Sequence, residues 1–496
     1  MTQKKVAVVG SGIAGLAAAI RLANSGIRVD LFEKNSYTGG KMTVYKQDGY
    51  RFDAGPSLFT LPHLVDDIFE SCGKNPRNYF HYRQLANACQ YFWQNGKKMV
   101  LKADYGENIK EIETNFGHSA ALSAKTYFND SKQKYELTEP FFLQQSLHRV
   151  KTFLDKRVIK VIAAIPRLEL FRSLNKINEK YFQDKELVQL FNRYATYNGS
   201  SPYQTPGIMQ MINHLEHGKG TFLPVGGMHK IAQSLTLLAE EMGVRIHLNQ
   251  NVEKVCSRGK VINSLSIGGK KKFFDAIILN SDIHFAYEHL LDDKIKRPKK
   301  TLAQAPSTSA VIFYWGINRK FDELDLHNIF FSNDYKKEFD QIAKNDNFWV
   351  DPTIYINITS KVELNDAPEG CENWFVMVNV PPNQGQDWEK IINKLRDKIL
   401  NRLSAELNAN LRHHLVTERI LNPIIIEDLT SSKGGSLYGT SSNDSLAAFI
   451  RHPNKKLRGY RGLYFCGGSA HPGGGIPLCL LSGKLAANWC LEDIHD

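Results

Sequence analysis

Short apolar runs near both ends of the chain are separated by long stretches of mixed polarity. Near the N-terminus, the run 6–9 has the length and composition of a buried strand, and a turn connects it to an alanine-rich stretch with helical periodicity at 16–23. A second apolar run, 28–32, reads as another strand. The order of strand, glycine turn and helix returns at 462–477. One such unit therefore lies near each end of the chain.

The first turn has the spacing of a nucleotide-binding loop. Glycines stand at Gly10, Gly12 and Gly15, and the second strand ends on Glu33. This order of strand, glycine turn, helix, strand and acid is the dinucleotide-binding fingerprint. Glycines allow a tight turn and a close approach to a pyrophosphate, and the free N–H groups at the helix start face the phosphates. Glu33 is expected to accept hydrogen bonds from ribose hydroxyls.

The second glycine-rich turn decides which dinucleotide is expected. It runs over 467–475, and Pro477 after it suits the first turn of a helix. A nicotinamide enzyme does not need this second turn. A flavin held in an extended pose does, because its isoalloxazine ring lies far from its adenine. The sequence therefore predicts FAD.

The pattern divides the chain into two interleaved parts. We predict a discontinuous FAD-binding domain built from 1–70, 221–282 and 455–496. The segment 71–220 is aromatic-rich and is predicted to be helical, whereas 283–454 alternates apolar and polar residues, which suggests sheet. The expected fold class is α/β, with a Rossmann-like FAD-binding domain, an inserted α+β substrate domain and a helical membrane-contact region.

The net charge and the cysteines indicate which partners and which cellular compartment to expect. The net charge is +12, which makes an anionic surface a plausible partner. No basic motif interleaved with aromatic residues is found, so acidic lipid is favoured over nucleic acid. Seven cysteines are scattered without a CxxC pair, which argues for reduced thiols in the cytoplasm and against a zinc or other metal site. We find no signal peptide and no apolar run long enough for a transmembrane helix.

One basic segment suggests a membrane surface. The segment 149–180 holds nine Lys or Arg against three Asp or Glu, interspersed with large apolar residues at roughly helical spacing. This composition is typical of an interfacial helix. The alternative is a pair of ordinary amphipathic surface helices. We predict peripheral association with the inner face of the membrane.

These motifs together resemble a known family. The chain is similar to the FAD-dependent carotenoid desaturases of the phytoene desaturase type, within the amine-oxidase-like flavoproteins. The most diagnostic string is His-Pro-Gly-Gly-Gly-Ile-Pro at 471–477, and within the family the C-terminal motif looks most like hydroxycarotenoid 3,4-desaturases. The matching segments are 6–15, 33–41, 53–57, 222–228 and 462–483.

The resemblance implies roles for individual residues. Ser11, Gly12 and Gly15 would hold the pyrophosphate, and Lys41 a phosphate or the ribityl chain. The loop 55–58 would line the isoalloxazine, and Val252 would present its backbone to adenine. The turn at 474–476 would aim the last helix at the N1–C2 edge of the flavin, where its partial positive charge stabilises a reduced anion. The full cofactor-binding set is expected to be Gly10, Ser11, Gly12, Ala14, Gly15, Glu33, Lys34, Gly40, Lys41, Gly55, Pro56, Ser57, Leu58, Val252, Asp282, Gly467, Gly468, Gly475 and Ile476.

The implied reaction removes two hydrogens from adjacent carbons of a long hydrophobic polyene. Such a substrate offers few polar handles, so its binding must come from burial of apolar surface. No catalytic base stands out. His471, in the glycine turn, is the first candidate, ahead of Glu139, His148 and Arg149.

Other readings of the same motifs stay open. A phytoene-type desaturase, a carotenoid isomerase and a flavin amine oxidase would all share the two glycine turns. The intact glycine set argues against a non-catalytic lipid carrier, and the lack of a second internal GxGxxG argues against a disulfide reductase. The residues indicate no particular terminal electron acceptor.

Overall fold

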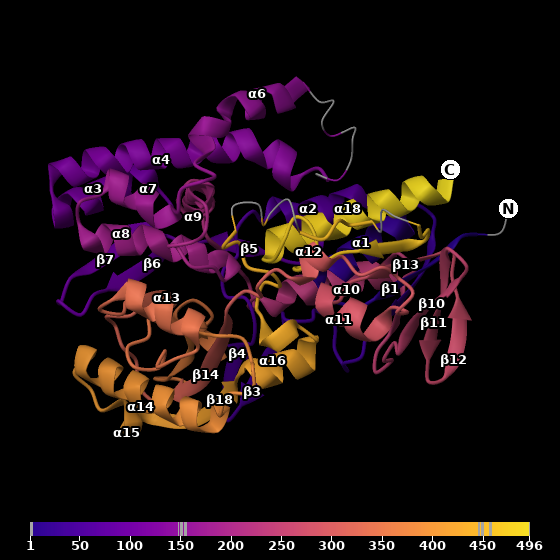
Figure 1. The fold of residues 1–496 in the computed structure, drawn as a ribbon. Helices are drawn as coiled ribbons and strands as arrows, with labels where there is room; N and C mark the ends of the chain where they lie inside the picture. The colour runs from indigo at the N-terminus through magenta and orange to yellow at the C-terminus, as the bar shows by residue number, and fades with distance from the viewer. Residues whose placement is uncertain are drawn as a thin grey trace.

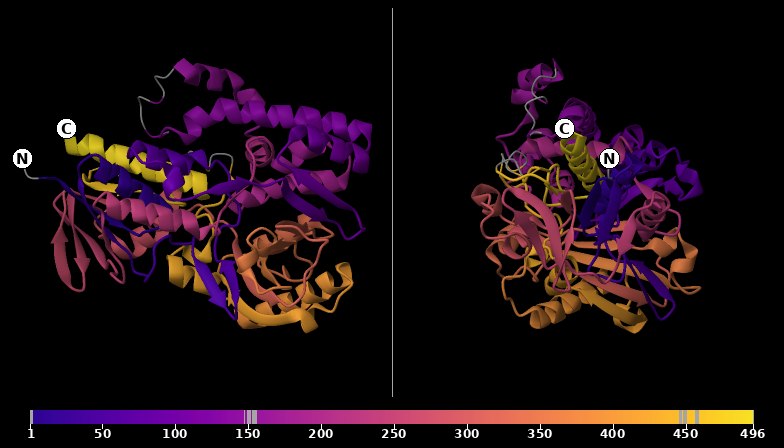
Figure 2. Two further views of the ribbon diagram at one scale, coloured as in Figure 1. Left: turned by 180° about the vertical axis from the view of Figure 1, so that it is seen from behind. Right: turned by 90° about the vertical axis from the view of Figure 1, so that its right-hand side faces the viewer.

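The computed structural model describes residues 3–146, 148, 152, 156–444, 447, 451–455 and 459–495 (Figure 1). Two sheets organise these residues, and both ends of the chain lie at the same end of the molecule (Figures 1 and 2). A layer of helices from the first half of the chain covers one side. Of the predicted basic segment 149–180, residues 149–151 and 153–155 lie outside the described residues.

The first sheet has five parallel strands in the order β19-β13-β1-β2-β9. Val9 at the end of β1 pairs with both Phe32 and Leu279. The strands are mostly apolar because both faces of the sheet are buried, one against helices and the other largely against a small antiparallel sheet within 254–273. Their bounds are β1 (Lys5–Val9), β2 (Arg28–Phe32), β9 (Arg245–His247), β13 (Ala276–Leu279) and β19 (Leu463–Phe465).

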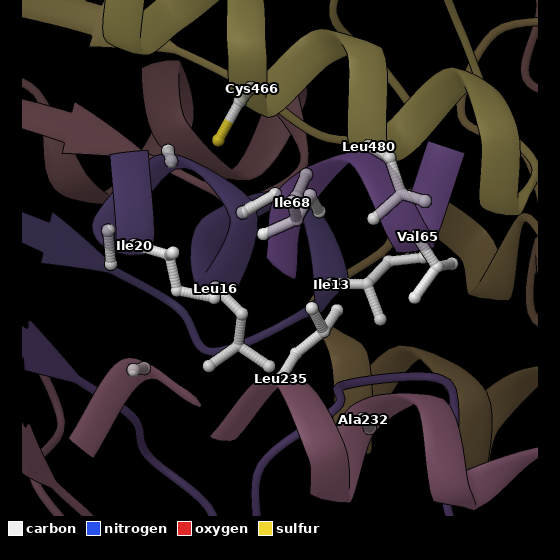
Figure 3. Packing of buried hydrophobic residues seen from close by; sticks show 14 of the residues in the cluster. Ile13, Leu16, Ile20, Val65, Ile68, Ala232, Leu235, Cys466 and Leu480 are labelled. Carbon is white, nitrogen blue, oxygen red and sulfur yellow. The ribbon is translucent and has the colours of Figure 1, made fainter. Parts of the chain in front are cut away.

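The helices around this sheet come from distant parts of the sequence. Buried side chains of α1 pack between those of α2, α10 and α18, as Figure 3 shows around Leu16. The packing of α18 on α1 is close, because a Cβ at Gly483 would lie 2.4 Å from the carbonyl oxygen of Ala14. The bounds are α1 (Ile13–Asn24), α2 (His63–Ser71), α10 (His229–Glu241) and α18 (Ile476–His495).

The second sheet has seven strands in the order β18-β14-β17-β16-β15-β6-β7, antiparallel except between β15 and β6. The helix α14 (Trp388–Glu406) packs its apolar side on one face of this sheet. The strands are β6 (Asn87–Phe92), β7 (Lys98–Lys102), β14 (Ser309–Ile317), β15 (His327–Phe330), β16 (Ile354–Asn357), β17 (Glu372–Val380) and β18 (Leu415–Leu421).

Two of these strands correct the prediction for 71–220, which was helical throughout. β6 and β7 form a hairpin that extends the second sheet by parallel pairing of Tyr91 with Ile329. Their buried positions alternate only over short stretches, such as Met99 and Leu101, and the longer helical periodicity that follows dominated the sequence pattern. The sheet is therefore assembled from both inserted segments.

The rest of 71–220 forms the helical layer. It comprises α3 (Tyr105–Phe116), α4 (His118–Thr138), α6 (Lys156–Ala164), α7 (Leu174–Tyr181), α8 (Lys185–Asn192), the 3₁₀ turn η4 (Arg193–Asn198) and α9 (Ile212–His217). α6 stands at the outer side of this layer (Figures 1 and 2). Within the described part of the chain, every helix is too short or too polar to cross a bilayer.

Smaller elements connect these layers. β3 (Val44–Gln47) and β4 (Tyr50–Asp53) form a hairpin, whereas β5 (Tyr82–Gln84) and β8 (Phe222–Pro224) are an antiparallel pair from distant parts of the sequence. β10 (Lys254–Arg258), β11 (Val261–Ile267) and β12 (Lys270–Phe273) form a separate three-stranded sheet. The remaining helices are α11 (Ile283–Phe285), α12 (Lys299–Leu302), α13 (Tyr335–Lys344), α15 (Leu411–His414) and α16 (Pro423–Thr430).

Candidate functional site

A single long cavity connects the two sheets. Glu33 and Val252 line it near the carboxyl ends of the parallel strands, and Phe375 and Met377 line it on the seven-stranded sheet. Ligands of open α/β sheets bind at the carboxyl ends of the strands. We call the part beside Glu33 the cofactor end and the part against the seven-stranded sheet the inner end.

The turn before α1 forms one wall of the cofactor end. Gly10, Gly12 and Ala14 line the cavity, and among the described residues no side chain caps the start of α1 at Gly12. Its first N–H groups are therefore available to an anion. Ser11 and Gly15 do not line the cavity. Gly15 lies where the helix packs against its own turn, and a Cβ there would come within 2.1 Å of the Gly10 carbonyl oxygen.

Glu33 is buried and fixed in place by the same turn. One carboxylate oxygen, Oε2, accepts hydrogen bonds of 2.8 Å from both the backbone N–H and the hydroxyl of Ser11. The other, Oε1, accepts one of 2.9 Å from the backbone N–H of Asn35. The side chain lines the cavity with its orientation set before any ligand binds.

Two lysines connect the cofactor end to the segment 428–438. The Lys34 ammonium donates to the carbonyl of Asp428 at 2.7 Å. Lys41 donates to the carbonyls of Ser436 and Leu437 at 2.8 Å each. Burial lowers the pKa of Lys41 to about 8, although the nearby Asp282 opposes the shift.

The segment 428–438 was assigned from sequence to the substrate domain, and its place in this wall was missed. It comprises the end of α16 and the residues after it, and its lining residues include Ser431, Ser432 and Tyr438. Nothing in its sequence resembles a nucleotide-binding motif. Its contacts with Lys34 and Lys41 cross almost four hundred residues, so local sequence carries no signal for them.

The loop 55–58 leads from the cofactor end toward the inner end. Gly55, Pro56, Ser57 and Leu58 all line the cavity, as does Gly40. A Cβ at Gly55 would lie 2.0 Å from the carbonyl oxygen of Lys41, so only glycine fits this crossing of two chain segments. The Ser57 hydroxyl makes a 2.8 Å hydrogen bond with the hydroxyl of Tyr355 on β16.

The second glycine turn closes the opposite wall. Gly467, Gly468, Gly475 and Ile476 line the cavity, and α18 begins at Ile476, so its N-terminus opens into the cavity. Val252 and Asp282 also line it. Asp282 caps α11 by accepting a 2.9 Å hydrogen bond from the His284 backbone N–H, and its burial raises its pKa.

His471, predicted as the first candidate for the catalytic base, does not line the cavity. It is buried behind the turn, where its Nε2 bonds to the carbonyl oxygen of Gln145 at 3.0 Å. Burial lowers its pKa to about 4. The turn folds so that the glycines face the cavity and the imidazole faces the helical layer. Glu139 and His148 are also absent from the wall, and Arg149 lies outside the described residues.

The inner end has an apolar wall and one polar cluster, neither of which the sequence singled out. Ile312, Phe375 and Met377 on the seven-stranded sheet supply apolar surface. The polar residues lie in the helical layer and on the two neighbouring strands β15 and β16. This inner polar cluster consists of Arg193, Tyr197, Glu216, His327 and Tyr355, all of which line the cavity.

The residues of the cofactor end fit the predicted FAD. The N-termini of two helices, α1 and α18, open into one cavity, which suits a ligand with negative charge at two separated places. Gly10 adopts φ +96° and a Cβ there would lie 2.5 Å from the Asn280 carbonyl oxygen, so only glycine fits at this point of the cavity wall. Glu33 supplies a fixed acceptor for hydroxyl groups.

Comparisons with known proteins agree with this geometry. A family model described as flavin containing amine oxidoreductase matches residues 13–491. A 1-hydroxycarotenoid 3,4-desaturase from Flavobacterium sp. (strain P99-3) is 48% identical over 486 residues, which cover 98% of each chain. A 4,4'-diapolycopene oxygenase from Methylomonas sp. is 30% identical over 99% of each chain. A solved structure of putrescine oxidase, 13% identical, covers 100% of this chain and 99% of its own with a TM-score of 0.66, which shows the shared fold.

Proposed function

The chain belongs to the family of flavin-containing amine oxidoreductases, and we propose that it is an FAD-dependent carotenoid desaturase that introduces the 3,4 double bond of a 1-hydroxycarotenoid. The observation that carries the proposal is the near full-length similarity to the Flavobacterium 3,4-desaturase. The cavity supports it, because an apolar inner end next to a nucleotide-binding end suits a long polyene and a flavin side by side.

At the cofactor end, the proposal gives each wall a role. The N-terminus of α1, with Gly10, Gly12 and Ala14, would hold the pyrophosphate, and the Glu33 carboxylate would accept hydrogen bonds from ribose hydroxyls. Lys41 would contact the ribityl chain, and the loop 55–58 would line the isoalloxazine. The positive end of α18 would stabilise negative charge on the ring. Ser11 and Gly15 act behind the wall, by fixing Glu33 and the packing of the turn.

At the inner end, the chain contributes burial and position. Bound FAD supplies a two-electron acceptor for the oxidation of a carbon–carbon single bond. The sheet residues Ile312, Phe375 and Met377 take up apolar surface of the polyene, at about 25 cal/mol for each Å² removed from water. They also keep water away from the reacting carbons.

We propose further that the protein docks on the inner face of an anionic membrane through the end of the helical layer at α6. Val158 and Val161 are buried against the layer, whereas Ile162, Ile165 and Phe171 are exposed, the last by 81%. Exposed basic residues stand among them: Lys160, Arg167 and Arg172. Apolar side chains surrounded by positive charge suit the boundary between headgroups and acyl chains.

Pigment analysis tests the reaction. Cells that accumulate either phytoene or a 1-hydroxylated acyclic carotenoid would express the chain, and the extracts would be compared by absorption spectrum and mass. A product that is two hydrogens lighter and red-shifted, from the hydroxylated substrate alone, is expected. Conversion of phytoene would instead make it a phytoene-type desaturase. A product of unchanged mass would indicate an isomerase.

Vesicle sedimentation tests the docking. The double variant Ile162→Ser/Phe171→Ser is expected to bind phosphatidylglycerol vesicles at least about tenfold more weakly than the native chain, because two apolar anchors are lost. Leu364→Ser, at a position exposed by 76% in the 3₁₀ turn Leu364–Asp366 outside the helical layer, is the control and should bind normally. Equal binding by all three proteins would contradict docking at this surface.

A further inference from the structure

The inner polar cluster places charge in the wall of an otherwise apolar space. Arg193 and Glu216 form an ion pair whose side chains are 6% and 1% exposed. Arg193 also donates from Nε to the Tyr91 hydroxyl at 2.9 Å, and the Tyr197 hydroxyl donates to Glu216. Burial opposes ionisation of Glu216, but the guanidinium of Arg193 holds its pKa below the usual value. Both groups are therefore charged beside the cavity.

His327 is the member of this cluster that has an unused hydrogen-bonding atom. Its Nδ1 contacts the Asn357 side-chain amide nitrogen at 3.2 Å, and the same nitrogen donates to the Leu326 carbonyl at 3.1 Å. The second bond fixes the orientation of the amide, so Nδ1 receives a hydrogen bond and carries no proton. Burial lowers the pKa of this histidine to about 4, although the charge of Glu216 opposes the shift. The neutral ring therefore carries its proton on Nε2.

That Nε2–H has no hydrogen-bond acceptor among the described residues. The side chain is buried and lines the cavity, and buried donors in folded proteins nearly always have a partner. A general base must have a free lone pair, and Nδ1 is already occupied. The geometry therefore leaves His327 the role of a hydrogen-bond donor to something held in the cavity.

His327 is also tied to the loop that faces the cofactor. The Tyr355 hydroxyl bonds to His327 Nδ1 at 2.8 Å and to the Ser57 hydroxyl at 2.8 Å. Its ring lies nearly parallel to the imidazole, with centroids 6.1 Å apart. Two consecutive hydrogen bonds, His327 to Tyr355 and Tyr355 to Ser57, therefore link the imidazole to the loop 55–58.

The chemistry of the proposed substrate requires a polar group at this place. In a 1-hydroxycarotenoid, the oxygen on C1 is separated from the reacting C3 by C1 and C2 alone. Whatever binds the hydroxyl must therefore lie close to where C3 meets the cofactor. A polyene without such an anchor can slide along an apolar wall, because each position buries similar surface.

We propose that the inner polar cluster recognises the terminal hydroxyl of the substrate, with His327 Nε2–H donating to the hydroxyl oxygen, and that this contact sets which carbons reach the cofactor. The proposal rests on the proposed function. Tyr355 and Asn357 are positioning residues that orient the imidazole. The Arg193–Glu216 pair makes the neighbouring wall polar, which favours a hydroxyl over a methyl group.

The test compares two substrates on three purified FAD-loaded variants. The substrates are a 1-hydroxylated acyclic carotenoid and the same polyene without the hydroxyl. His327→Leu is expected to lower kcat/KM for the hydroxylated substrate by about tenfold to a hundredfold while leaving the other substrate within about twofold, so that selectivity falls. His327→Gln, which can still present an N–H, should recover part of the loss.

His214→Gln is the matched control. His214 is buried in α9 of the helical layer, bonds through Nδ1 to Tyr105 and also has an unpartnered Nε2, but it does not line the cavity. This variant should keep the native selectivity. Equal losses on both substrates in His327→Leu and His327→Gln would overturn the recognition role. Failure of the native protein on both substrates would instead count against the proposed function, so the two failures are distinguishable.

Discussion

Each end of the cavity has a buried glutamate, Glu33 or Glu216, and the two are held by different means. Glu33, at the cofactor end, is fixed by backbone N–H groups and a serine hydroxyl. Glu216, at the inner end, is fixed by the guanidinium of Arg193 and by a tyrosine. The main partners stand at similar distances along the chain, 22 residues for Ser11 and Glu33 and 23 for Arg193 and Glu216.

This contrast teaches why only one end could be recognised from sequence. The number of residues that separate the two partners is nearly the same for both pairs, so it cannot be the reason. A site built by the backbone requires glycines at fixed spacing, and these leave a visible signature. A site built by side chains needs only that a few polar residues converge, and an arginine and a glutamate among aromatic helices look like any others.

The largest expected effect lies at the inner end. Arg193→Met should lower the free energy of unfolding by about 3–5 kcal/mol, because Glu216 would be left as an uncompensated buried charge. Chemical denaturation measures this loss. The double variant Arg193→Met/Glu216→Leu should recover most of it, since no charge then remains buried.

An exposed ion pair provides the matched control. Arg412 lies 2.9 Å from Asp397 with both side chains well exposed, so Arg412→Met should cost less than about 1 kcal/mol. A double variant as unstable as Arg193→Met alone would show that the loss comes from packing and not from the pairing of charges.

At the cofactor end, a somewhat smaller loss of stability is expected from the addition of a single carbon atom. Gly15→Ala should cost about 1–3 kcal/mol and weaken FAD binding, because the new Cβ would meet a backbone oxygen that cannot move aside. Thermal unfolding and flavin absorbance measure the two effects. Gly26→Ala, where the Cβ meets nothing within 4 Å, should cost only about 1 kcal/mol from its positive φ. Normal FAD content in Gly15→Ala would contradict the close packing of the turn.

A smaller effect is expected when the charge of Glu33 is removed. Glu33→Gln keeps one acceptor oxygen but loses the charge, so FAD affinity should fall about tenfold, or roughly 1.4 kcal/mol. Titration calorimetry of the apoprotein measures it. Glu253→Gln serves as the control, because that carboxylate is exposed and bonds to Ser266. An unchanged affinity in Glu33→Gln would show that the carboxylate only organises the turn.

The smallest effect concerns the buried cation of the cofactor end, Lys41, which is held by carbonyls and not by a carboxylate. Its pKa is lowered to about 8 in the fold and is near 10.4 in the unfolded chain. Between these values the unfolded chain binds the extra proton, so the stability of the apoprotein rises with pH. The native protein should gain up to about 1 kcal/mol relative to Lys41→Met between pH 8 and pH 9. A difference that does not change over this range would contradict the lowered pKa.

Much of the fold could be predicted because local patterns decided it. The strands at 6–9 and 28–32 and the helical stretch at 16–23 agree closely with β1, β2 and α1. β6 and β7 were not predicted because each is short, and because β6 joins the sheet by pairing with β15, more than two hundred residues away. The FAD-binding residues stay predictions, although all but Ser11 and Gly15 line the cavity.

The catalytic candidate His471 stays a prediction, but its position behind the cavity wall could not be read from the sequence. The motif at 471–477 suggested a catalytic base beside the flavin. Which side of a turn each residue faces, however, depends on the whole fold. His471 is buried behind the glycines, and the histidine that lines the cavity, His327, begins a strand with no motif around it. A histidine in a motif is therefore weaker evidence of function than a histidine with an unpartnered nitrogen in a cavity wall.

The contact of α18 with α1 has a consequence for how the protein is made. β1 and α1 emerge from the ribosome first, but their sheet lacks β19 and their helix lacks its neighbour until residues 463–495 have been synthesised. Until then the side of α1 that packs on α18 is open to solvent and to chaperones, and the two inserted segments can fold before it is covered. The cofactor end is thus synthesised early in this chain, but its fold is complete only after residues 463–495 have been synthesised.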